Sequence, residues 1–144
     1  MKKIVINSCY GGFGLSLLGM KRLAELRGED VYFYKKTIYK SKDGFKAKYS
    51  IVKDINSESL YVYALNKYLG ETFNEFPDDD NLFFDDCEDK RDDANLIKVV
   101  EELGEKASGT YASLKIVEIP DDVEWEIQEY NGSEWVEGGD KIWW

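Results

Sequence analysis

Residues 7–16, Asn-Ser-Cys-Tyr-Gly-Gly-Phe-Gly-Leu-Ser, combine flexible backbone with aromatic side chains in a way that is typical of a ligand site. They lie between a predicted buried strand and a predicted helix, where glycine N–H groups and the positive end of a helix dipole can hold an anion. Two aromatic rings in the segment offer surfaces on which a flat ligand can stack. The predicted binding residues of this segment are Tyr10, Gly11, Gly12, Phe13, Gly14 and Ser16.

The glycine spacing differs from both standard phosphate-binding patterns. A dinucleotide-binding fingerprint needs a third glycine after two more residues, and Leu15-Ser16-Leu17 does not supply it. A P-loop needs a lysine directly after its last glycine, and no lysine follows before Lys21. The alternative interpretation is a tight strand-to-helix turn whose glycines adopt positive φ, and the sequence leaves both interpretations open.

The chain contains no histidine and only two cysteines, Cys9 and Cys87. The absence of histidine excludes Ser-His and Cys-His nucleophile systems and most transition-metal sites. Cys9 is interpreted as a small buried hydrophobic residue, and Cys87 lies among acidic residues that raise a thiol pKa. We therefore expect no enzymatic activity, no metal and no cofactor.

Residues 77–93 form an acidic segment, with nine acidic residues against two cations, Lys90 and Arg91. Clustered carboxylates are typical of calcium sites, but Leu82 and Phe83 occupy positions where an EF-hand needs a ligand and a glycine. The pattern favours a solvated acidic loop. The alternative is that the carboxylates mimic nucleic-acid phosphates and block a host protein.

Arg91 is one of three arginines in the chain. Arginine forms bidentate contacts with phosphate groups, so we predict that Arg91 contributes to the ligand site. The alternative is that Arg91 neutralises the neighbouring aspartates Asp89, Asp92 and Asp93.

The formal net charge of the 144-residue chain is −10. A protein without a summed positive field is not expected to bind DNA, RNA or anionic membranes directly. The length predicts a single domain over residues 1–144. Free cysteines and the absence of a long apolar run predict a cytoplasmic location.

The elements that must position these residues form an alternating pattern of helices and hairpins. Helices are predicted over residues 16–28 and 94–103, the first capped by Ser16 and the second by Asp93. Residues 60–69 fit either a strand or a helix capped by Ser57 or Ser59, and we favour a helix over residues 59–69. Strands are predicted over residues 3–7, 31–39, 45–51, 114–119, 123–128 and 133–137, with a short strand at the C-terminus. Asn131-Gly132 is the strongest hairpin signal, because both central residues of a type I′ turn need positive φ. We therefore predict an α+β fold with a mainly antiparallel sheet and two or three helices.

Trp143 and Trp144 would leave an apolar patch that is typical of an interface, so we expect a homodimer or a higher homo-oligomer. In that dimer, Arg91 or Lys141 of one subunit would lie over the glycine loop of the other. The first turn of the helix after Gly14 would hold one phosphate.

Four segments resemble a family of short proteins from tailed phages and prophages: Cys-Tyr-Gly-Gly-Phe-Gly-Leu-Ser (9–16), Glu-Glu-Leu-Gly (101–104), Leu-Lys-Ile-Val-Glu-Ile-Pro-Asp-Asp-Val (114–123) and Glu-Tyr-Asn-Gly (129–132). The resemblance covers about half of the chain, and the present C-terminus lacks the basic His-Arg pair expected before the last tryptophan. It implies a phage origin and a role in countering host immunity. By similarity to Thoeris anti-defence sponges, the protein is expected to sequester a cyclic-nucleotide-like signal without cleaving it. The alternative is an acidic phage protein that binds and blocks a host protein.

Overall fold

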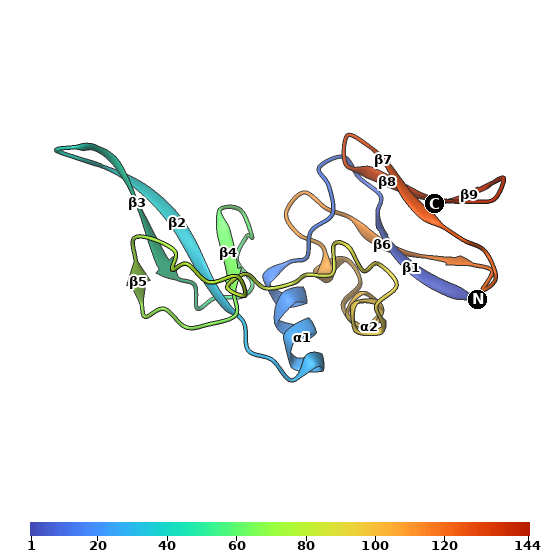
Figure 1. Cartoon of the computed structure of the whole chain (residues 1–144), viewed down its shortest axis with the longest axis horizontal. Coiled ribbons are helices and arrows are strands. Elements are labelled where there is room, and N and C mark those ends of the chain that lie inside the picture. The colour runs from blue at the N-terminus through green and yellow to red at the C-terminus, as the bar shows by residue number, and fades with distance from the viewer.

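Two helices separate two groups of strands along the long axis of the molecule, whose computed structural model describes residues 1–144 (Figure 1). The helices are α1 (Leu17–Arg27) and α2 (Ala94–Leu103), and a short 3-10 helix, η1 (Gly104–Ala107), follows α2. One group of strands consists of β1 (Lys2–Asn7), β6 (Leu114–Ile119), β7 (Glu126–Tyr130), β8 (Ser133–Gly138) and β9 (Lys141–Trp143). The other group consists of β2 (Tyr32–Ser41), β3 (Gly44–Ile51), β4 (Val62–Leu65) and β5 (Thr72–Phe73).

Both helices begin and end at residues whose chemistry favours helix termini. Ser16 caps α1, because its Oγ accepts a hydrogen bond from the backbone N–H of Gly19 at 3.0 Å. Gly28 ends α1 with a φ of 70°, in the left-handed region that glycine adopts readily. Asp93 caps α2 by accepting a hydrogen bond from the backbone N–H of Asn95 at 2.9 Å. The helices predicted at these two places are therefore confirmed.

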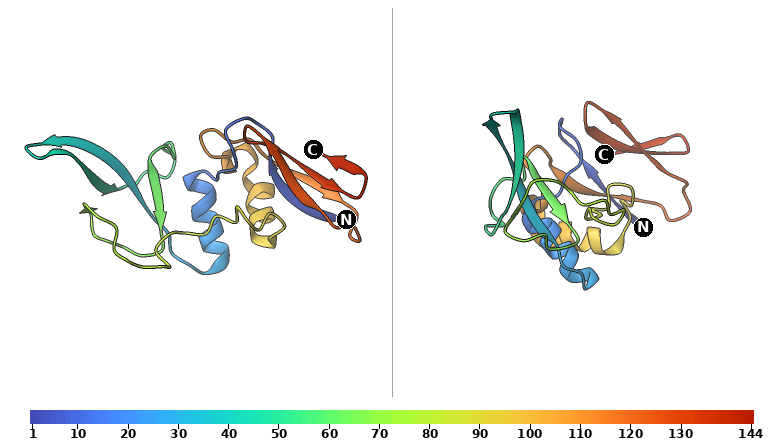
Figure 2. Two further views of the ribbon diagram at one scale, coloured as in Figure 1. Left: turned by 45° about the horizontal axis from the view of Figure 1, so that its top comes forward. Right: turned by 60° about the vertical axis from the view of Figure 1, so that its left-hand side comes forward.

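The strands near the chain termini form two sheets that pack face to face (Figure 2). β1 pairs antiparallel with β6, and β7, β8 and β9 form a three-stranded antiparallel sheet. Asn131 and Gly132 join β7 to β8 with φ values of 50° and 90°, as a type I′ turn requires, so the hairpin predicted there is confirmed. The buried residues between the two sheets are Ile4, Ile6, Val117, Ile119 and Val136.

The sheet with strand order β4–β2–β3–β5 carries an aromatic core. Tyr34 and Tyr49 are buried, and the rings of Phe73 and Phe76 pack against them. The Tyr49 and Phe73 ring centroids lie 4.8 Å apart in a stacked arrangement. The Tyr34 hydroxyl donates a hydrogen bond to the Gly70 carbonyl at 2.8 Å, so the polar end of this buried side chain has a partner.

The helix predicted over residues 59–69 is wrong, because this segment contains β4. Tyr63 of β4 lies opposite Tyr34 of β2, and Leu65 is fully buried. The apolar residues of the segment fit both the helical and the strand period. Pairing with β2 supplies the backbone hydrogen bonds and buries the same residues, so the tertiary contact decides the structure.

α1 and α2 pack against each other in the centre of the molecule (Figure 2). Their core of 14 buried residues includes Leu17, Leu23, Leu96 and Val99. The chain therefore has the predicted α+β fold with mainly antiparallel sheets. Neither helix has the length and apolar character needed to cross a membrane.

Candidate functional site

The glycine loop, residues 8–14, packs against two turns that are distant in the sequence. The backbone N–H of Gly11 donates a hydrogen bond to the β7–β8 turn at 3.2 Å. A Cβ on Gly132 of that turn would overlap the Gly12 nitrogen, and a Cβ on Gly11 would overlap the Tyr111 carbonyl oxygen. Gly11 and Gly12 also have φ values of 140° and 93°. Close backbone packing therefore requires glycine at positions 11 and 132, whereas at position 12 there is open space for a Cβ and only the positive φ favours glycine.

Asn7, the last residue of β1, fixes the start of the glycine loop through its buried side chain. Its Nδ2 donates hydrogen bonds to the carbonyls of Cys9 at 2.7 Å and Gly132 at 2.8 Å. Its Oδ1 accepts a hydrogen bond from the backbone N–H of Ser113 at 2.8 Å. One side chain thereby connects the loop to the start of β6 and to the β7–β8 turn.

Arg91 and Glu134 form a buried bidentate ion pair behind the glycine loop. Nη1 and Nη2 of Arg91 donate to Oε1 and Oε2 of Glu134, each at 2.7 Å, and the side chains are only 6% and 8% exposed. The guanidinium lies 3.9 Å from the ring centroid of Phe13, and its other hydrogen bonds go to the carbonyls of Glu88 and Val5. The predicted ligand residues therefore contact each other, with Arg91 buried and Phe13 half-buried, and Arg91 pairs with Glu134 and not with the neighbouring aspartates.

Glu134 connects this ion pair to Asn7, because its Oε1 also accepts the Asn7 backbone N–H at 2.7 Å. A buried charge is tolerated when it is paired and hydrogen-bonded, and both charges meet that condition. We call Asn7, Arg91 and Glu134 the buried network. It connects β1, β8 and the segment before α2, and it therefore sets the position of the glycine loop.

The first turn of α1, where a phosphate contact is predicted, packs against η1. Ser16 Oγ donates a hydrogen bond to the Lys106 carbonyl at 2.6 Å, and the Ser16 backbone N–H donates to the Ala107 carbonyl at 2.9 Å. A Cβ on Gly19 would lie 3.0 Å from the same Ala107 oxygen, so η1 packs directly on the helix end. Ser16 is therefore a capping residue whose hydroxyl and N–H already have partners, and the phosphate contact stays a prediction.

A hollow of about 230 Å³ lies on the outer side of the glycine loop, and we call it the loop hollow. Tyr61 and Tyr111 line it and are 67% and 62% exposed, and Tyr10 in the loop itself is 70% exposed. Ser59 Oγ and Thr110 Oγ1 lie 3.0 Å apart and tie two walls of the hollow together. The lining residues are Gly11, Gly12, Phe13, Gly14, Leu15, Ser59, Leu60, Tyr61, Gly109, Thr110, Tyr111 and Ala112.

Tyr61 stands at the border between the loop hollow and a second hollow of about 580 Å³. Its φ is 59°, which is an uncommon value for an aromatic residue and places Tyr61 in a turn. The second hollow contains Lys35 and Lys53 together with Asp54 and Glu58. A ligand that extends past Tyr61 would therefore meet both cationic and anionic side chains.

The two thiols are engaged in structural contacts. Cys9 is half-buried, and its Sγ donates to the Tyr111 carbonyl at 3.1 Å. Cys87 is buried, burial raises its pKa, and Arg27 donates a hydrogen bond to its sulfur at 2.8 Å. No three acidic or cysteine side chains come together in a group that could hold a metal ion.

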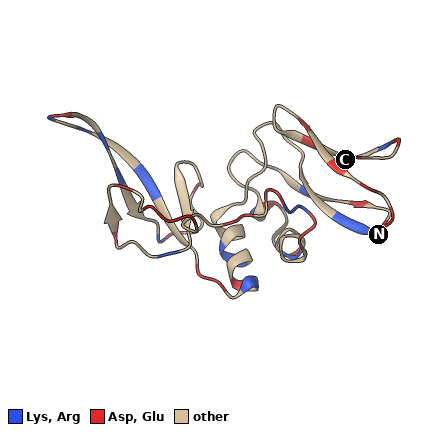
Figure 3. Cartoon of the chain, viewed as in Figure 1, with Lys and Arg blue, Asp and Glu red and all other residues tan.

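The acidic segment, visible as a red stretch beside the helices in Figure 3, uses many of its carboxylates within the chain. Asp79, Asp85, Asp86 and Asp93 each accept a hydrogen bond from the backbone N–H two residues further on, at 2.9 to 3.2 Å. Such local turns are a common reason for aspartate in loops. These carboxylates therefore shape their own segment.

The acids of this segment differ in their pKa values. A hydrogen bond from Lys67 lowers the pKa of Asp79, and the backbone N–H of Cys87 together with Lys90 lowers that of Asp85. Burial raises the pKa of Asp86. The fold therefore favours the charged form of Asp79 and Asp85 and disfavours the charged form of Asp86.

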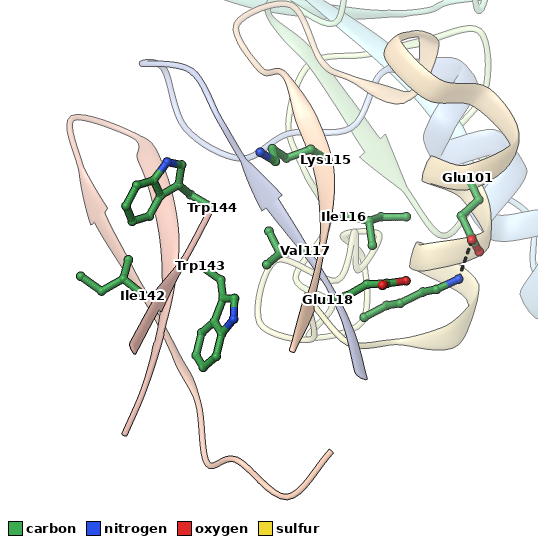
Figure 4. A pocket seen from close by; sticks show the side chains of 9 residues that line it. Glu101, Lys115, Ile116, Val117, Glu118, Ile142, Trp143 and Trp144 are labelled. Carbon is green, nitrogen blue, oxygen red and sulfur yellow. Dashed lines mark hydrogen bonds and ion pairs between the residues drawn. The ribbon is translucent and has the colours of Figure 1, made fainter. Parts of the chain in front are cut away.

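A larger hollow of about 720 Å³ lies at the C-terminal end, between β6, α2 and β9 (Figure 4). Trp143 packs against the core between the two terminal sheets, whereas Trp144 is 70% exposed. Lys3 forms an ion pair with Glu101 at 2.8 Å on the α2 side. The C-terminal hollow shares no lining residue with the loop hollow, and the dimer expected from the two tryptophans stays a prediction.

Comparisons with protein-family models, with curated proteins and with solved structures find no match to this chain. The site is therefore interpreted from its geometry. Sequence reasoning missed Tyr61, Tyr111 and Glu134. The signal for Glu134 is its place on the same face of β8 as Val136, where an acid among inward-facing residues indicates a buried partner.

Proposed function

We propose that the protein binds a small nucleotide-like ligand in the loop hollow and does not convert it chemically. The observation that supports this proposal is that the glycine loop lines a hollow bordered by exposed tyrosines. The loop hollow contains no carboxylate or amine that could serve as a general acid or base. The proposed ligand-contacting residues are Tyr10, Gly11, Gly12, Phe13, Tyr61 and Tyr111, with Arg91 as a positioning residue that lies against the Phe13 ring.

Stacking on tyrosine would supply the main attraction. An exposed aromatic ring stacked on a base is worth about 1–3 kcal/mol, and it accepts any base because every base has a π face. Ser59 and Thr110 connect the backbone segments that carry Tyr61 and Tyr111, so the two positions from which the rings project are held together. Such preorganisation lowers the entropy that binding must overcome.

The phosphates of such a ligand would reach the second hollow, where Lys35 and Lys53 lie. Lys53 is paired with Glu71 at 3.7 Å, but both side chains are highly exposed. An exposed ion pair contributes little, so a phosphate can replace the carboxylate. We therefore propose that these two lysines, and not the N–H groups of the first turn of α1, contact the phosphates.

The biological role that we attach to this binding follows from the resemblance to short phage proteins. A protein that holds a cyclic-nucleotide-like immune signal without cleaving it lowers the concentration of the free signal. Binding alone is sufficient for that role.

Isothermal titration with AMP, ADP-ribose and cyclic di-AMP tests the proposal. We expect at least one of them to bind, and we expect Tyr61→Ala or Tyr111→Ala to weaken that binding about tenfold, which corresponds to ~1.4 kcal/mol. Tyr130→Ala is the matched control, because Tyr130 is 65% exposed but lines none of the hollows described here. Its binding should equal that of the unaltered protein.

Three results would contradict the proposal. The first is that none of these ligands binds and that native mass spectrometry of the protein purified from cells finds no retained small molecule. The second is equal affinity of the Tyr61→Ala, Tyr111→Ala and unaltered proteins. The third is the release of products in excess of the protein, which would identify an enzyme.

A further inference from the structure

The β2–β3 hairpin is the positive part of an acidic protein (Figure 3). Residues 32–51 contain six lysines and one acid, Asp43, for a net charge of +5. The remainder of the chain has 13 basic and 28 acidic residues and a net charge of −15. The total charge of −10, from which no binding to nucleic acid is expected, conceals this separation of a positive hairpin from an acidic remainder.

None of the six lysines takes part in an ion pair, although nine ion pairs form elsewhere in the molecule. The six residues are Lys35, Lys36, Lys40, Lys42, Lys46 and Lys48. In a chain with 29 acids, unpaired cations gathered on one hairpin favour contact with an anion outside the chain.

The outer part of the hairpin projects from the molecule as a two-stranded ribbon (Figure 1). β4 pairs with β2 only as far as Lys35, and β5 pairs with β3 only at Tyr49 and Ser50. The ribbon from Lys36 to Ser41 therefore extends by about 20 Å beyond the sheet. Salt at about 0.1 M screens charges over roughly 10 Å, so the outer lysines are shielded from the acidic remainder of the protein.

Lysines occupy both faces of this ribbon. Tyr39 lies opposite Lys46 and Ile38 lies opposite Ala47, and side chains alternate between the faces along each strand. Lys36 and Lys40 therefore project from one face, and Lys46 and Lys48 from the other. A membrane or a flat acidic protein surface would contact only one of these faces. A groove with a phosphate backbone on each side contacts both.

The dimensions of the ribbon distinguish between nucleic acids. The major groove of B-form DNA is about 12 Å wide and admits a two-stranded β-ribbon, whereas the major groove of A-form RNA is deep and narrow. The tip of the ribbon, Ser41 to Gly44, is polar, which disfavours insertion into a lipid bilayer.

We propose that the β2–β3 ribbon binds double-stranded DNA by entering its major groove, with the lysines of the two faces contacting the two phosphate backbones. Ile38 and Phe45 lie on the same face as Lys36 and Lys40 and are 62% and 76% exposed, so this face combines cations with apolar side chains that no other part of the chain covers. This site is independent of ligand binding in the loop hollow.

Fluorescence anisotropy with a short fluorescein-labelled DNA duplex tests the proposal. We expect dissociation constants of roughly 10–100 μM at physiological salt, with tighter binding at lower salt. In the double variant Lys46→Gln, Lys48→Gln, binding should weaken about tenfold at low salt, and the log–log slope against salt should fall by about 2. The matched control is Lys21→Gln, Lys98→Gln, which removes the same charge from α1 and α2 and should change binding less than about twofold.

Each of four other outcomes would overturn the proposal. Equal weakening in the ribbon variant and the helix variant would identify a general charge effect. Equal binding of single-stranded DNA or of duplex RNA would contradict entry into a B-form major groove. Binding to phosphatidylserine vesicles without binding to DNA would identify a membrane site. Salt-sensitive self-association that Lys46→Gln, Lys48→Gln abolishes would identify a second copy of the chain as the partner. Circular dichroism verifies that all variants remain folded.

Discussion

The glycine loop and the carboxylates of the acidic segment differ in the range of the contacts they make. The loop depends on hydrogen bonds that connect Asn7 to Gly132, 125 positions away, and Cys9 to Tyr111, 102 positions away. The carboxylates of Asp85 and Asp86 accept hydrogen bonds from two residues ahead, and Asp85 pairs with Lys90, five residues away. The long-range contacts of the acidic segment come from its other groups, such as the Arg91 side chain, which bonds to Glu134.

This difference indicates that the glycine loop can form a binding site, whereas the carboxylates of the acidic segment mainly stabilise local turns. A loop that distant elements hold in place brings together side chains from several parts of the chain, as the loop hollow does. In the acidic segment, by contrast, the positions of the aspartates are explained by the local backbone hydrogen bonds that they accept. Substitutions in the two segments should therefore differ in both stability and binding.

Removing Glu134 should have the largest effect. Glu134→Ala leaves the buried Arg91 guanidinium without its carboxylate, which typically costs about 3–5 kcal/mol of folding free energy. Urea denaturation measures this change, with Glu124→Ala as an exposed control that should stay within about 0.5 kcal/mol. A loss below about 1 kcal/mol for Glu134→Ala would show that the buried network does not hold the loop.

Gly132→Ala should have the next largest effect. The added Cβ would overlap backbone atoms of Gly11 and Gly12, so we expect a loss of about 2–4 kcal/mol from overpacking and backbone strain together. Gly139→Ala isolates the strain, because Gly139 has a φ of 60° and open space around its Cβ position, and should cost about 1 kcal/mol. Equal thermal shifts for the two variants would contradict close packing at the loop.

Replacing the acids should have a small effect on stability and none on ligand binding. We expect the combined Asp78→Asn, Asp79→Asn, Asp80→Asn, Asp85→Asn and Asp86→Asn variant to keep its affinity in the titrations described above. Asparagine Oδ1 can still accept the local backbone hydrogen bonds, and each exposed ion pair lost contributes at most about 1 kcal/mol. A loss of affinity in this variant would move the site toward the acidic segment.

The smallest effect is a change in the pH dependence of stability. Because burial raises the folded-state pKa of Asp86, its charged form is a penalty at neutral pH that disappears once the pH falls below the ordinary aspartate pKa of about 4. Asp86→Asn should therefore raise the melting temperature at pH 7 and leave it unchanged near pH 3. Asp79→Asn should show the opposite sign at pH 7, because the lowered pKa of Asp79 stabilises the fold above the same pKa.

The sequence predicts the elements whose signals are local. Ser16, Gly28, Asp93 and the Asn131 turn each act within a few residues, and all four appear where they are expected. The strand over residues 62–65 was missed because its partner, β2, decides between two periods that the segment fits equally. The sequence does not indicate that Arg91, which is predicted to bind ligand, lies inside the protein. Its partner Glu134 is 43 positions away, and residue spacing carries no information over that distance.

The pairing of β1 with the C-terminal part of the chain also bears on synthesis at the ribosome. Asn7 leaves the exit tunnel 127 residues before Glu134, its hydrogen-bond partner. At about 5–20 residues per second, β1 waits roughly 6–25 s before the buried network can close. The hairpin and the two helices can fold in this interval, but the glycine loop lacks its contacts with Gly132 and Glu134 until these residues have emerged.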